Sequence, residues 1–260
     1  MDIALEREQF ERDGFVIVNQ LLSEDEAALL GQVARADQHL AMSAYGREDA
    51  TGTIVTLSVR NELVDDYYSA IARSERIVQR MSSYLGDEVY HYHHKLILKE
   101  PRIGGAWEWH QDYGYWYNNG CLTPDMGSCL IAIDRATQVN GCLQVLKGSH
   151  KIGRINHGTI GDQTGADLER VVVAEERYVN VPVELSPGSA VFFHSNLLHR
   201  SDRNSSELPR WALICCYNTR HNDPYKESRH PRYSPLNVLA DDDLLPAGLN
   251  HRSRLAETNS

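Results

Sequence analysis

The 260-residue sequence has no long hydrophobic run, no excess of positive charge and no paired-cysteine metal motif. Its apolar runs all fall well short of the roughly 20 residues of a membrane-spanning helix, and its charged N-terminus carries no apolar signal core. A formal net charge of −10 argues against nucleic acid or an anionic membrane as a partner. We therefore expect a cytoplasmic protein that binds neither of them.

Cysteine is also scarce, and its five residues are an odd number without a C-x-x-C pair: Cys121, Cys129, Cys142, Cys215 and Cys216. Most of them lie in apolar, strand-like runs, which indicates buried reduced thiols. At 42% hydrophobic residues the chain can bury one substantial core. We expect one domain over residues 1–260, with a core of about 8–220 and a wrapping tail at 221–260, as a monomer or homodimer.

What the sequence does contain is a polar pair inside an aromatic stretch, Trp107-Glu108-Trp109-His110-Gln111-Asp112-Tyr113. In a β-strand residues i and i+2 face the same side, so His110 and Asp112 would project into one space. Such a pair lacks only a second histidine to form the facial triad of non-haem Fe(II) oxygenases. Taken alone, His-x-Asp is better explained by two polar residues on a solvated strand.

A second polar cluster lies about ninety residues downstream. His199 is the candidate third ligand, and Arg210 follows it by eleven residues and opens the apolar run 211–217, which is typical of a buried strand. A buried arginine is costly unless it meets an anion. A carboxylate held bidentately by the planar guanidinium would satisfy it. This layout suits an iron enzyme whose co-substrate is a dicarboxylate.

His-x-Asp, His199, a serine two residues later (Ser201) and Arg210 together resemble the pattern of the phytanoyl-CoA hydroxylase (PhyH) family, including its ectoine-hydroxylase-like members. These are Fe(II)/2-oxoglutarate dioxygenases. The stretches 10–18 and 140–151 agree, so the resemblance covers most of the chain, from about residue 8 to about residue 220. It implies a mainly β fold with flanking helices: a double-stranded β-helix, or cupin-like jelly-roll barrel, with N-terminal α-helices.

The resemblance also implies a mechanism. His110, Asp112 and His199 would be the catalytic residues and would bind Fe(II), and Arg210 with Ser201 would hold 2-oxoglutarate. The reaction would consume O2, hydroxylate an unactivated C–H bond and release succinate and CO2, with ascorbate stimulating it. From the residues that follow the ligands, described below, we expect the substrate to be a small, polar metabolite.

Two further residues are candidates for binding the co-substrate. The run 89–99 alternates as a strand, and it places His93 and Lys95 on one face. In ectoine hydroxylases a glutamine and an arginine occupy the aligned positions, so we assign His93 and Lys95 to 2-oxoglutarate, and Lys95 also to the substrate. The neighbouring His91 and His94 are not expected to bind metal, because an iron site must keep open positions.

Aromatic residues that follow the first two ligands are the candidates for binding the substrate. Trp116 stands six residues after His110, where ectoine hydroxylase also has a tryptophan, and Tyr113 follows Asp112 directly. An aromatic wall attracts a cation by roughly 0.5–2 kcal/mol per ring. With Lys95 as a counter-charge, the pattern predicts a zwitterionic substrate with an ammonium group. For Tyr115 and Tyr117, ordinary packing is the favoured interpretation.

Three alternatives remain open on the residues alone. Two histidines and a carboxylate also suit a Zn(II) hydrolase, although that function leaves Arg210 and Ser201 without a purpose. A cupin-like module could bind metal without turnover. The substrate could also be an acyl-CoA thioester, for which the acidic chain offers no basic phosphate-binding patch.

Local patterns predict the following elements. Helices are expected at 5–13, from 24 to about 40, and between Ser74 and Gly86; strands at 15–18, 53–59, 89–99, 127–133, 142–146, 179–184, 189–193 and 211–217. Residues 42–60 are expected as a loop with one strand near the mouth of the active site. Residues 152–176 are expected as an excursion over the barrel, and 222–260 as a wrapping tail with a frayed end.

Overall fold

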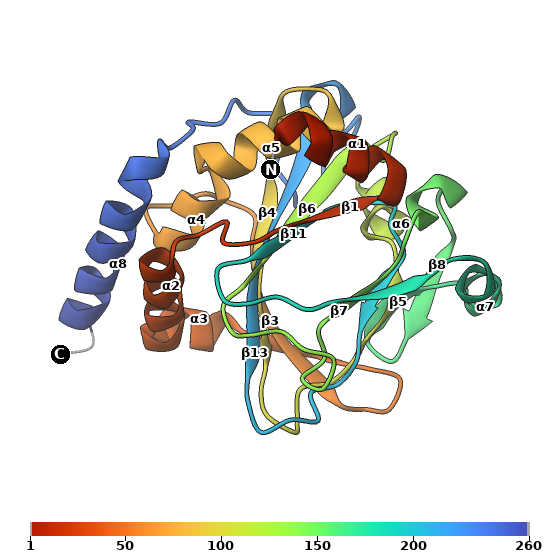
Figure 1. Cartoon of the computed structure of the whole chain (residues 1–260), viewed down its shortest axis with the longest axis horizontal. Helices are drawn as coiled ribbons and strands as arrows, with labels where there is room; N and C mark the ends of the chain where they lie inside the picture. Colours follow the sequence, from red (N-terminus) through yellow and green to blue (C-terminus); the bar gives the residue numbers. More distant parts are fainter. Residues whose placement is uncertain (1, 259–260) are drawn as a thin grey trace.

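A computed structural model describes residues 2–258 as two facing β-sheets, with most of the helices packed on the outer face of one of them (Figure 1). Within that range the larger sheet has seven strands in the order β1-β11-β6-β13-β4-β3-β2. Their bounds are β1 Phe15–Val18, β2 Tyr45–Glu48, β3 Ile54–Arg60, β4 Val89–Lys99, β6 Met126–Ala132, β11 Ala190–His194 and β13 Arg210–Thr219. Strands β1 and β4 have the bounds that the sequence predicts, the first from a short apolar run and the second from an alternating pattern.

The smaller sheet has four strands in the order β10-β7-β12-β5 and faces the larger one. Its members are β5 Trp107–His110, β7 Leu143–Leu146, β10 Asn180–Val183 and β12 His199–Ser201. The strand pairs are antiparallel and the two sheets share no strand, so the barrel is not closed by hydrogen bonds. An apolar core fills the space between the sheets. The expected fold class, a jelly roll with flanking helices, is confirmed.

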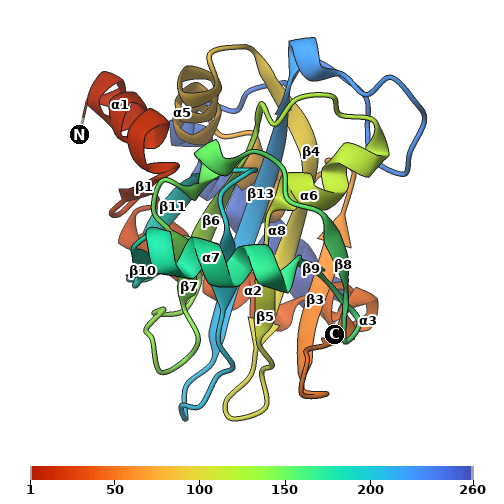
Figure 2. The ribbon, with the colours of Figure 1, turned by 90° about the vertical axis from the view of Figure 1, so that its right-hand side faces the viewer.

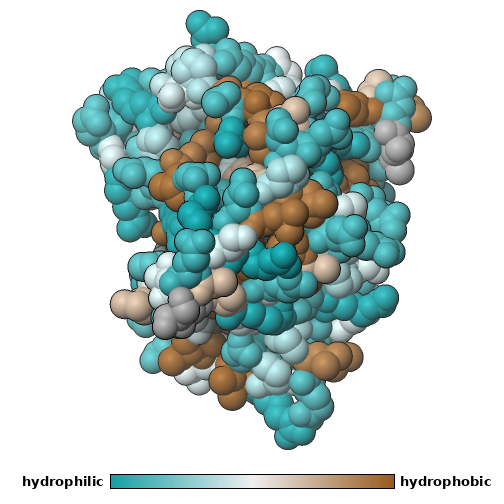
Figure 3. Space-filling model, turned by 90° about the vertical axis from the view of Figure 1, so that its left-hand side faces the viewer, coloured by the Kyte–Doolittle hydropathy of each residue, from teal (hydrophilic) through white to brown (hydrophobic). Residues whose placement is uncertain are grey.

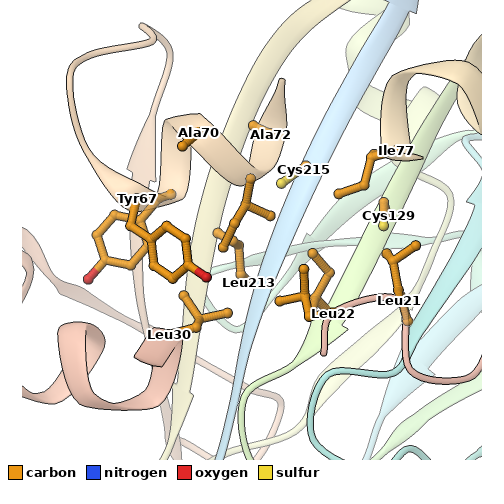
Figure 4. Close-up of a cluster of buried hydrophobic side chains, with 14 of the residues drawn as sticks. Leu21, Leu22, Leu30, Tyr67, Ala70, Ala72, Ile77, Cys129, Leu213 and Cys215 are labelled. Atoms are coloured by element: carbon orange, nitrogen blue, oxygen red, sulfur yellow. The ribbon is translucent and has the colours of Figure 1, made fainter. Parts of the chain in front are cut away.

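Helices cover the outer face of the larger sheet. They are α1 Ile3–Asp13, α2 Glu24–Ala36, α3 Gln38–Ser43, α4 Tyr67–Ala72, α5 Glu75–Leu85 and α8 Leu244–Thr258. Figure 4 shows the resulting core, in which Leu30 of α2 and Tyr67 of α4 point towards Leu213 and Cys215 of β13. The outside of this layer is largely hydrophilic, with apolar side chains in scattered groups (Figure 3). Among residues 2–258, no helix is long and apolar enough to cross a bilayer.

Local capping explains where the first helices begin and end. Gly14 ends α1 in the left-handed conformation (φ 83°), and Ser23 and Glu26 form a capping box at the start of α2. The second helix was expected to continue to about Leu40, but it ends at Ala36 because Asp37 leaves the helical conformation. The Asp37 carboxylate accepts a hydrogen bond from the Leu40 amide and begins α3 instead.

Two segments without a clear periodic pattern are more regular than the sequence predicts. Residues 42–60 hold a β2–β3 hairpin rather than one strand in a loop. Residues 152–176 hold the β8–β9 hairpin (His157–Ile160 and Gln163–Ala166) and most of α7 (Leu168–Arg177). As Figure 2 shows, α7 covers the outer face of the smaller sheet, where Val171 and Ala174 pack into a third apolar cluster.

The tail, which was expected to wrap the domain, contains the fifteen-residue helix α8, and the expected frayed end lies partly outside the described residues. Leu244, Gly248, His251 and Leu255 recur at helical spacing and are buried, and α8 lies against α2 and α4. Pro246 is the third helical residue, where no intrahelical N–H bond is lost. Shorter 3₁₀ turns lie at Tyr117–Asn119, Ser149–Ile152, Arg220–Asn222 and Asp241–Asp243.

A β-bulge changes the faces of β4. The register against β13 shifts so that Tyr92 is an extra residue between His91 and His93. Strict alternation, which would put His91 and His93 on one face, is therefore wrong. His91 hydrogen-bonds to His94 (3.0 Å) away from the barrel interior, whereas His93 lines a cavity inside it.

Candidate active site

The three predicted metal ligands come together at the edge of the smaller sheet. His110 ends β5, His199 begins β12 directly opposite it, and Asp112 is the first residue of α6 (Asp112–Trp116). The expectation that His110 and Asp112 share one strand is wrong, because the strand ends between them. Gln111 nevertheless keeps an extended backbone (φ −113°, ψ 131°), which preserves the i, i+2 convergence. One ligand atom from each residue lies within 4.8 Å of the others, and all three residues are buried.

Both histidines are prepared to bind a metal ion through Nε2. Nδ1 of His110 donates to the carbonyl of Glu108 and Nδ1 of His199 to the carbonyl of Leu197, each at 2.8 Å. This tautomer leaves the Nε2 lone pairs free. Burial lowers the pKa of both imidazoles, well below the usual range for His110, so both are neutral at pH 7. Neutral imidazoles are the form that coordinates metal.

Asp112 is held as an oriented carboxylate. Its Oδ1 accepts a hydrogen bond from the Tyr115 hydroxyl (2.7 Å) and its Oδ2 one from Ser128 Oγ (3.1 Å). Burial favours a higher pKa for Asp112, but the nearby Lys95 ammonium and the hydrogen bond from Tyr115 help to lower the pKa below its usual range. One carboxylate and two neutral imidazoles, each with an outer hydrogen bond, fit a divalent iron ion.

Gln111 ties the ligand-bearing segments together. Its side chain donates to the carbonyls of Gly153 (2.8 Å) and Asn196 (2.9 Å) and accepts from the amide of Ile155 (2.7 Å). The backbone N–H of Gln111 donates to Nε2 of His157. The fully buried Gln111 therefore connects the first two ligands to the turn that precedes His199.

A narrow inner cavity lies beside the ligands, between the two sheets. It is lined by all three ligands, by Lys95, Lys99, Arg200, Ser201 and Arg210, and by apolar side chains. Asp112 is the one acidic residue in this lining. The inner cavity is therefore positively charged although the chain as a whole is negative. The structure brings Arg210, Ser201 and Lys95 to it, as expected, whereas His93 is absent from the lining.

An outer cavity of about 620 Å³ lies next to the inner one, and Lys95 and Trp107 line both. This volume is within the roughly 300–1,000 Å³ that is usual for small-molecule sites. His93 and Trp116 line the outer cavity, with their rings 5.5 Å apart and edge-to-face. Tyr113 lines neither cavity: it packs in the core, and its hydroxyl donates to the carbonyl of Cys121. Tyr45 and Arg47 of β2 line the outer cavity, so residues 42–60 do lie at the site.

Several site residues were not predicted. Lys99 lines the inner cavity, and strict alternation from Lys95 would have identified it, because both residues lie on one face of β4. Tyr115, which bonds to Asp112, had been interpreted as packing. Arg229 and His230 come from the tail and line the outer cavity, where His230 stacks on Tyr92 at 4.4 Å. No local pattern indicated these two tail residues.

A jelly roll that brings two histidines and one carboxylate together carries the ligand set of the non-haem Fe(II) oxygenases. The sequence model of the phytanoyl-CoA dioxygenase (PhyH) family matches residues 10–212, and the chain belongs to this family.

Two similar proteins are a hydroxylase and a dioxygenase. The chain is 28% identical over 250 residues to L-proline trans-4-hydroxylase of Streptomyces griseoviridis, covering 90% of this chain and 91% of the relative. It is 28% identical over 247 residues to ectoine dioxygenase of Bordetella bronchiseptica (86% and 79% covered). The structure of EctD from S. alaskensis with 2-oxoglutarate and 5-hydroxyectoine superposes with a TM-score of 0.77 at 24% identity, covering 91% of this chain and 87% of that one.

Proposed function

We propose that this protein is an Fe(II)- and 2-oxoglutarate-dependent hydroxylase of a small, polar metabolite. The observation that carries the proposal is the placement of His110, Asp112 and His199 beside two adjoining cavities. The inner cavity is positively charged and suits a dicarboxylate, and the outer one has the size of a small-molecule site. Lys95 borders both cavities.

Each residue of the site has a proposed role. His110, Asp112 and His199 would hold the iron, while Tyr115 and Ser128 fix the orientation of the Asp112 carboxylate. Arg210 and Ser201 would bind the distal carboxylate of 2-oxoglutarate. With 2-oxoglutarate and O2, the bound iron would supply the chemistry for oxidative decarboxylation to succinate and CO2, coupled to hydroxylation of an unactivated C–H bond. Ascorbate is expected to stimulate turnover.

The substrate is proposed to be a zwitterion. The outer cavity presents Arg47, Lys95 and Arg229 but only one acidic residue, Asp162, so a substrate carboxylate finds cationic partners there. Trp116 lines the same cavity, and the face of its ring would attract an ammonium group. One relative acts on L-proline, an amino acid, and another is named for ectoine, which supports a small substrate of this kind. His93 lies at the outer cavity and is therefore assigned to substrate rather than to 2-oxoglutarate.

The first test is succinate formation from 2-oxoglutarate with Fe(II), O2 and ascorbate, with L-proline, ectoine and other small amino acids as candidate substrates. A true substrate is expected to increase succinate formation and to yield a product heavier by one oxygen, measured by mass spectrometry. EDTA is expected to abolish the reaction, and Zn(II) is expected not to restore it. Metal-dependent hydrolysis that Zn(II) supports would instead indicate a hydrolase.

The second test concerns Trp116. Trp116→Ala is expected to raise the KM of the identified substrate by about three- to thirtyfold, which corresponds to the loss of a cation–π contact. It should also uncouple decarboxylation from hydroxylation, seen as succinate in excess of product. Trp116→Phe keeps an aromatic ring and should retain most of the affinity. If both variants hydroxylate the substrate normally, Trp116 is a packing residue.

Two alternatives would give different results in the same assays. A non-catalytic module would bind metal and 2-oxoglutarate without substrate-stimulated turnover. An acyl-CoA hydroxylase would respond to thioesters rather than to amino acids.

We further propose a single domain that works as a monomer or homodimer in the cytoplasm. The five buried free thiols support a reducing compartment.

A further inference from the structure

Two buried cations lie side by side at the inner cavity. Lys99 and Arg210 are register partners across the antiparallel pair β4–β13, and both line the cavity with Ser201. Lys99 is 0% exposed and Arg210 is 4% exposed. Side chains that are directly opposite in neighbouring strands are close enough to interact, and like charges in that position repel.

Within residues 2–258 the hydrogen-bond partners of these two cations are neutral, and the carboxylates of Asp202 and Asp49 favour the charged form of Lys99 only from a distance. Lys99 donates to Ser201 Oγ (2.9 Å) and to the carbonyl of Asp202, and Arg210 donates to the carbonyl of Gly141 (2.6 Å). Nε of Arg210 is buried without a hydrogen-bond partner in the same range. Burial, and then Arg210, lower the pKa of Lys99 well below its usual range, whereas the pKa of Arg210 falls only to about 10. This pair of cations is unfavourable until an anion joins it.

The two lysines of the inner cavity are separated along β4. Lys95 acts electrostatically on Asp112 and so belongs to the metal end. Lys99 lies four residues further on the same face, which corresponds to about 13 Å along the strand. The cavity therefore carries positive charge at both ends, as an elongated dianion requires.

Lys99 also determines where the Ser201 hydroxyl proton points. An ammonium group has only donors, so its bond to Ser201 Oγ occupies a lone pair of that oxygen. The hydroxyl hydrogen of Ser201 must then be directed elsewhere, and Ser201 borders the cavity. A carboxylate in the cavity would accept that hydrogen bond.

We propose that Lys99 is a co-substrate-positioning residue that orients the Ser201 hydroxyl towards the distal carboxylate of 2-oxoglutarate and adds a second positive charge beside Arg210. The inference rests on the proposed use of 2-oxoglutarate. It implies that this protein selects 2-oxo acids with a second carboxylate more strongly than Arg210 alone would allow.

The test is a binding cycle between Lys99 and the distal carboxylate. Four proteins are compared by calorimetric titration: the wild type, Lys99→Met, Ser201→Ala and the double variant. Each is titrated with 2-oxoglutarate and with 2-oxopentanoate, in which a methyl group replaces the distal carboxylate. Mn(II) replaces Fe(II), so no turnover occurs. Lys151→Met, at an exposed lysine, is the matched control.

Lys99→Met is expected to weaken 2-oxoglutarate binding about ten- to a hundredfold, as the loss of a charge-assisted interaction does, and to leave 2-oxopentanoate binding unchanged. Its effect should shrink in the Ser201→Ala background, because Lys99 acts partly through that hydroxyl. Equal weakening for both acids, or unchanged 2-oxoglutarate binding, would overturn the role of Lys99. If the wild type binds no 2-oxoglutarate, the proposed function itself is wrong.

Thermal unfolding separates this role from a structural one. Without ligand, the Tm of Lys99→Met should equal or exceed that of the wild type, because a buried cation without a carboxylate partner has been removed. The increase in Tm caused by Mn(II) and 2-oxoglutarate should become smaller. A ligand-free Tm lower by several degrees, with an unchanged ligand response, would make Lys99 a structural residue. Lys99→Gln, which keeps a donor but not the charge, should lose 2-oxoglutarate affinity in the same direction.

Discussion

His110→Ala, Asp112→Ala and His199→Ala are each expected to reduce substrate-dependent succinate formation to the background of the assay. Each change removes one of three protein ligands whose atoms lie within 4.8 Å of one another. The remaining pair cannot hold the ion in the facial geometry that leaves positions open for 2-oxoglutarate and O2. Iron affinity, measured anaerobically by calorimetry or metal analysis, should fall together with activity, while the far-UV circular dichroism of the variants stays unchanged.

The matched control is His39→Ala, since His39 is an exposed histidine on α3. It should retain full iron binding and turnover. Asp112→Asn adds a sharper comparison, because the amide keeps the size of the side chain but loses the charge that balances Lys95 and the metal. If any alanine variant of the three ligands kept near-wild-type activity and Fe(II) affinity, the ligand assignment would be wrong.

The second large effect is expected at Arg210. Arg210→Ala should raise the KM for 2-oxoglutarate about ten- to a hundredfold, because a charge-assisted, bidentate interaction contributes roughly 1.5–3 kcal/mol. The KM for the identified substrate should change little, since Arg210 lines only the inner of the two cavities. Initial rates at varied 2-oxoglutarate and fixed saturating substrate, and the reverse, give both constants.

Arg203→Ala, at an exposed arginine seven residues before Arg210, is the control and should change neither constant. A folded Arg210→Ala protein with an unchanged KM for 2-oxoglutarate would contradict the role. In that case Lys99 and Lys95, the other cations at the two ends of the inner cavity, would be the next candidates.

Motifs of fixed spacing made the cluster of His110, Asp112 and His199 and the place of Arg210 predictable, since i, i+2 convergence depends only on extended backbone at Gln111. The role of Lys99 was not predictable in the same way. It depends on pairing with Arg210 across two strands far apart in sequence, and local periodicity does not determine such pairing.

The bulge at Tyr92 was missed for a related reason. An extra residue is defined only against the partner strand β13, so the sequence of β4 alone predicts unbroken alternation. In the tail, Pro and Asp composition obscured the buried stripe of α8. Strand β1 was predicted to the residue because its four consecutive apolar residues directly follow Gly14, which ends α1.

The tail that supplies Arg229 and His230 has a consequence for how this protein can diverge. Those residues line the outer cavity, yet they lie beyond residues 10–212, the part that carries the family's shared pattern. Mutations in this tail can change the shape of the outer cavity while leaving the proposed iron ligands and the inner cavity unchanged. Selection could therefore change which metabolite is oxidised by altering a short C-terminal segment, without rebuilding the oxidation machinery.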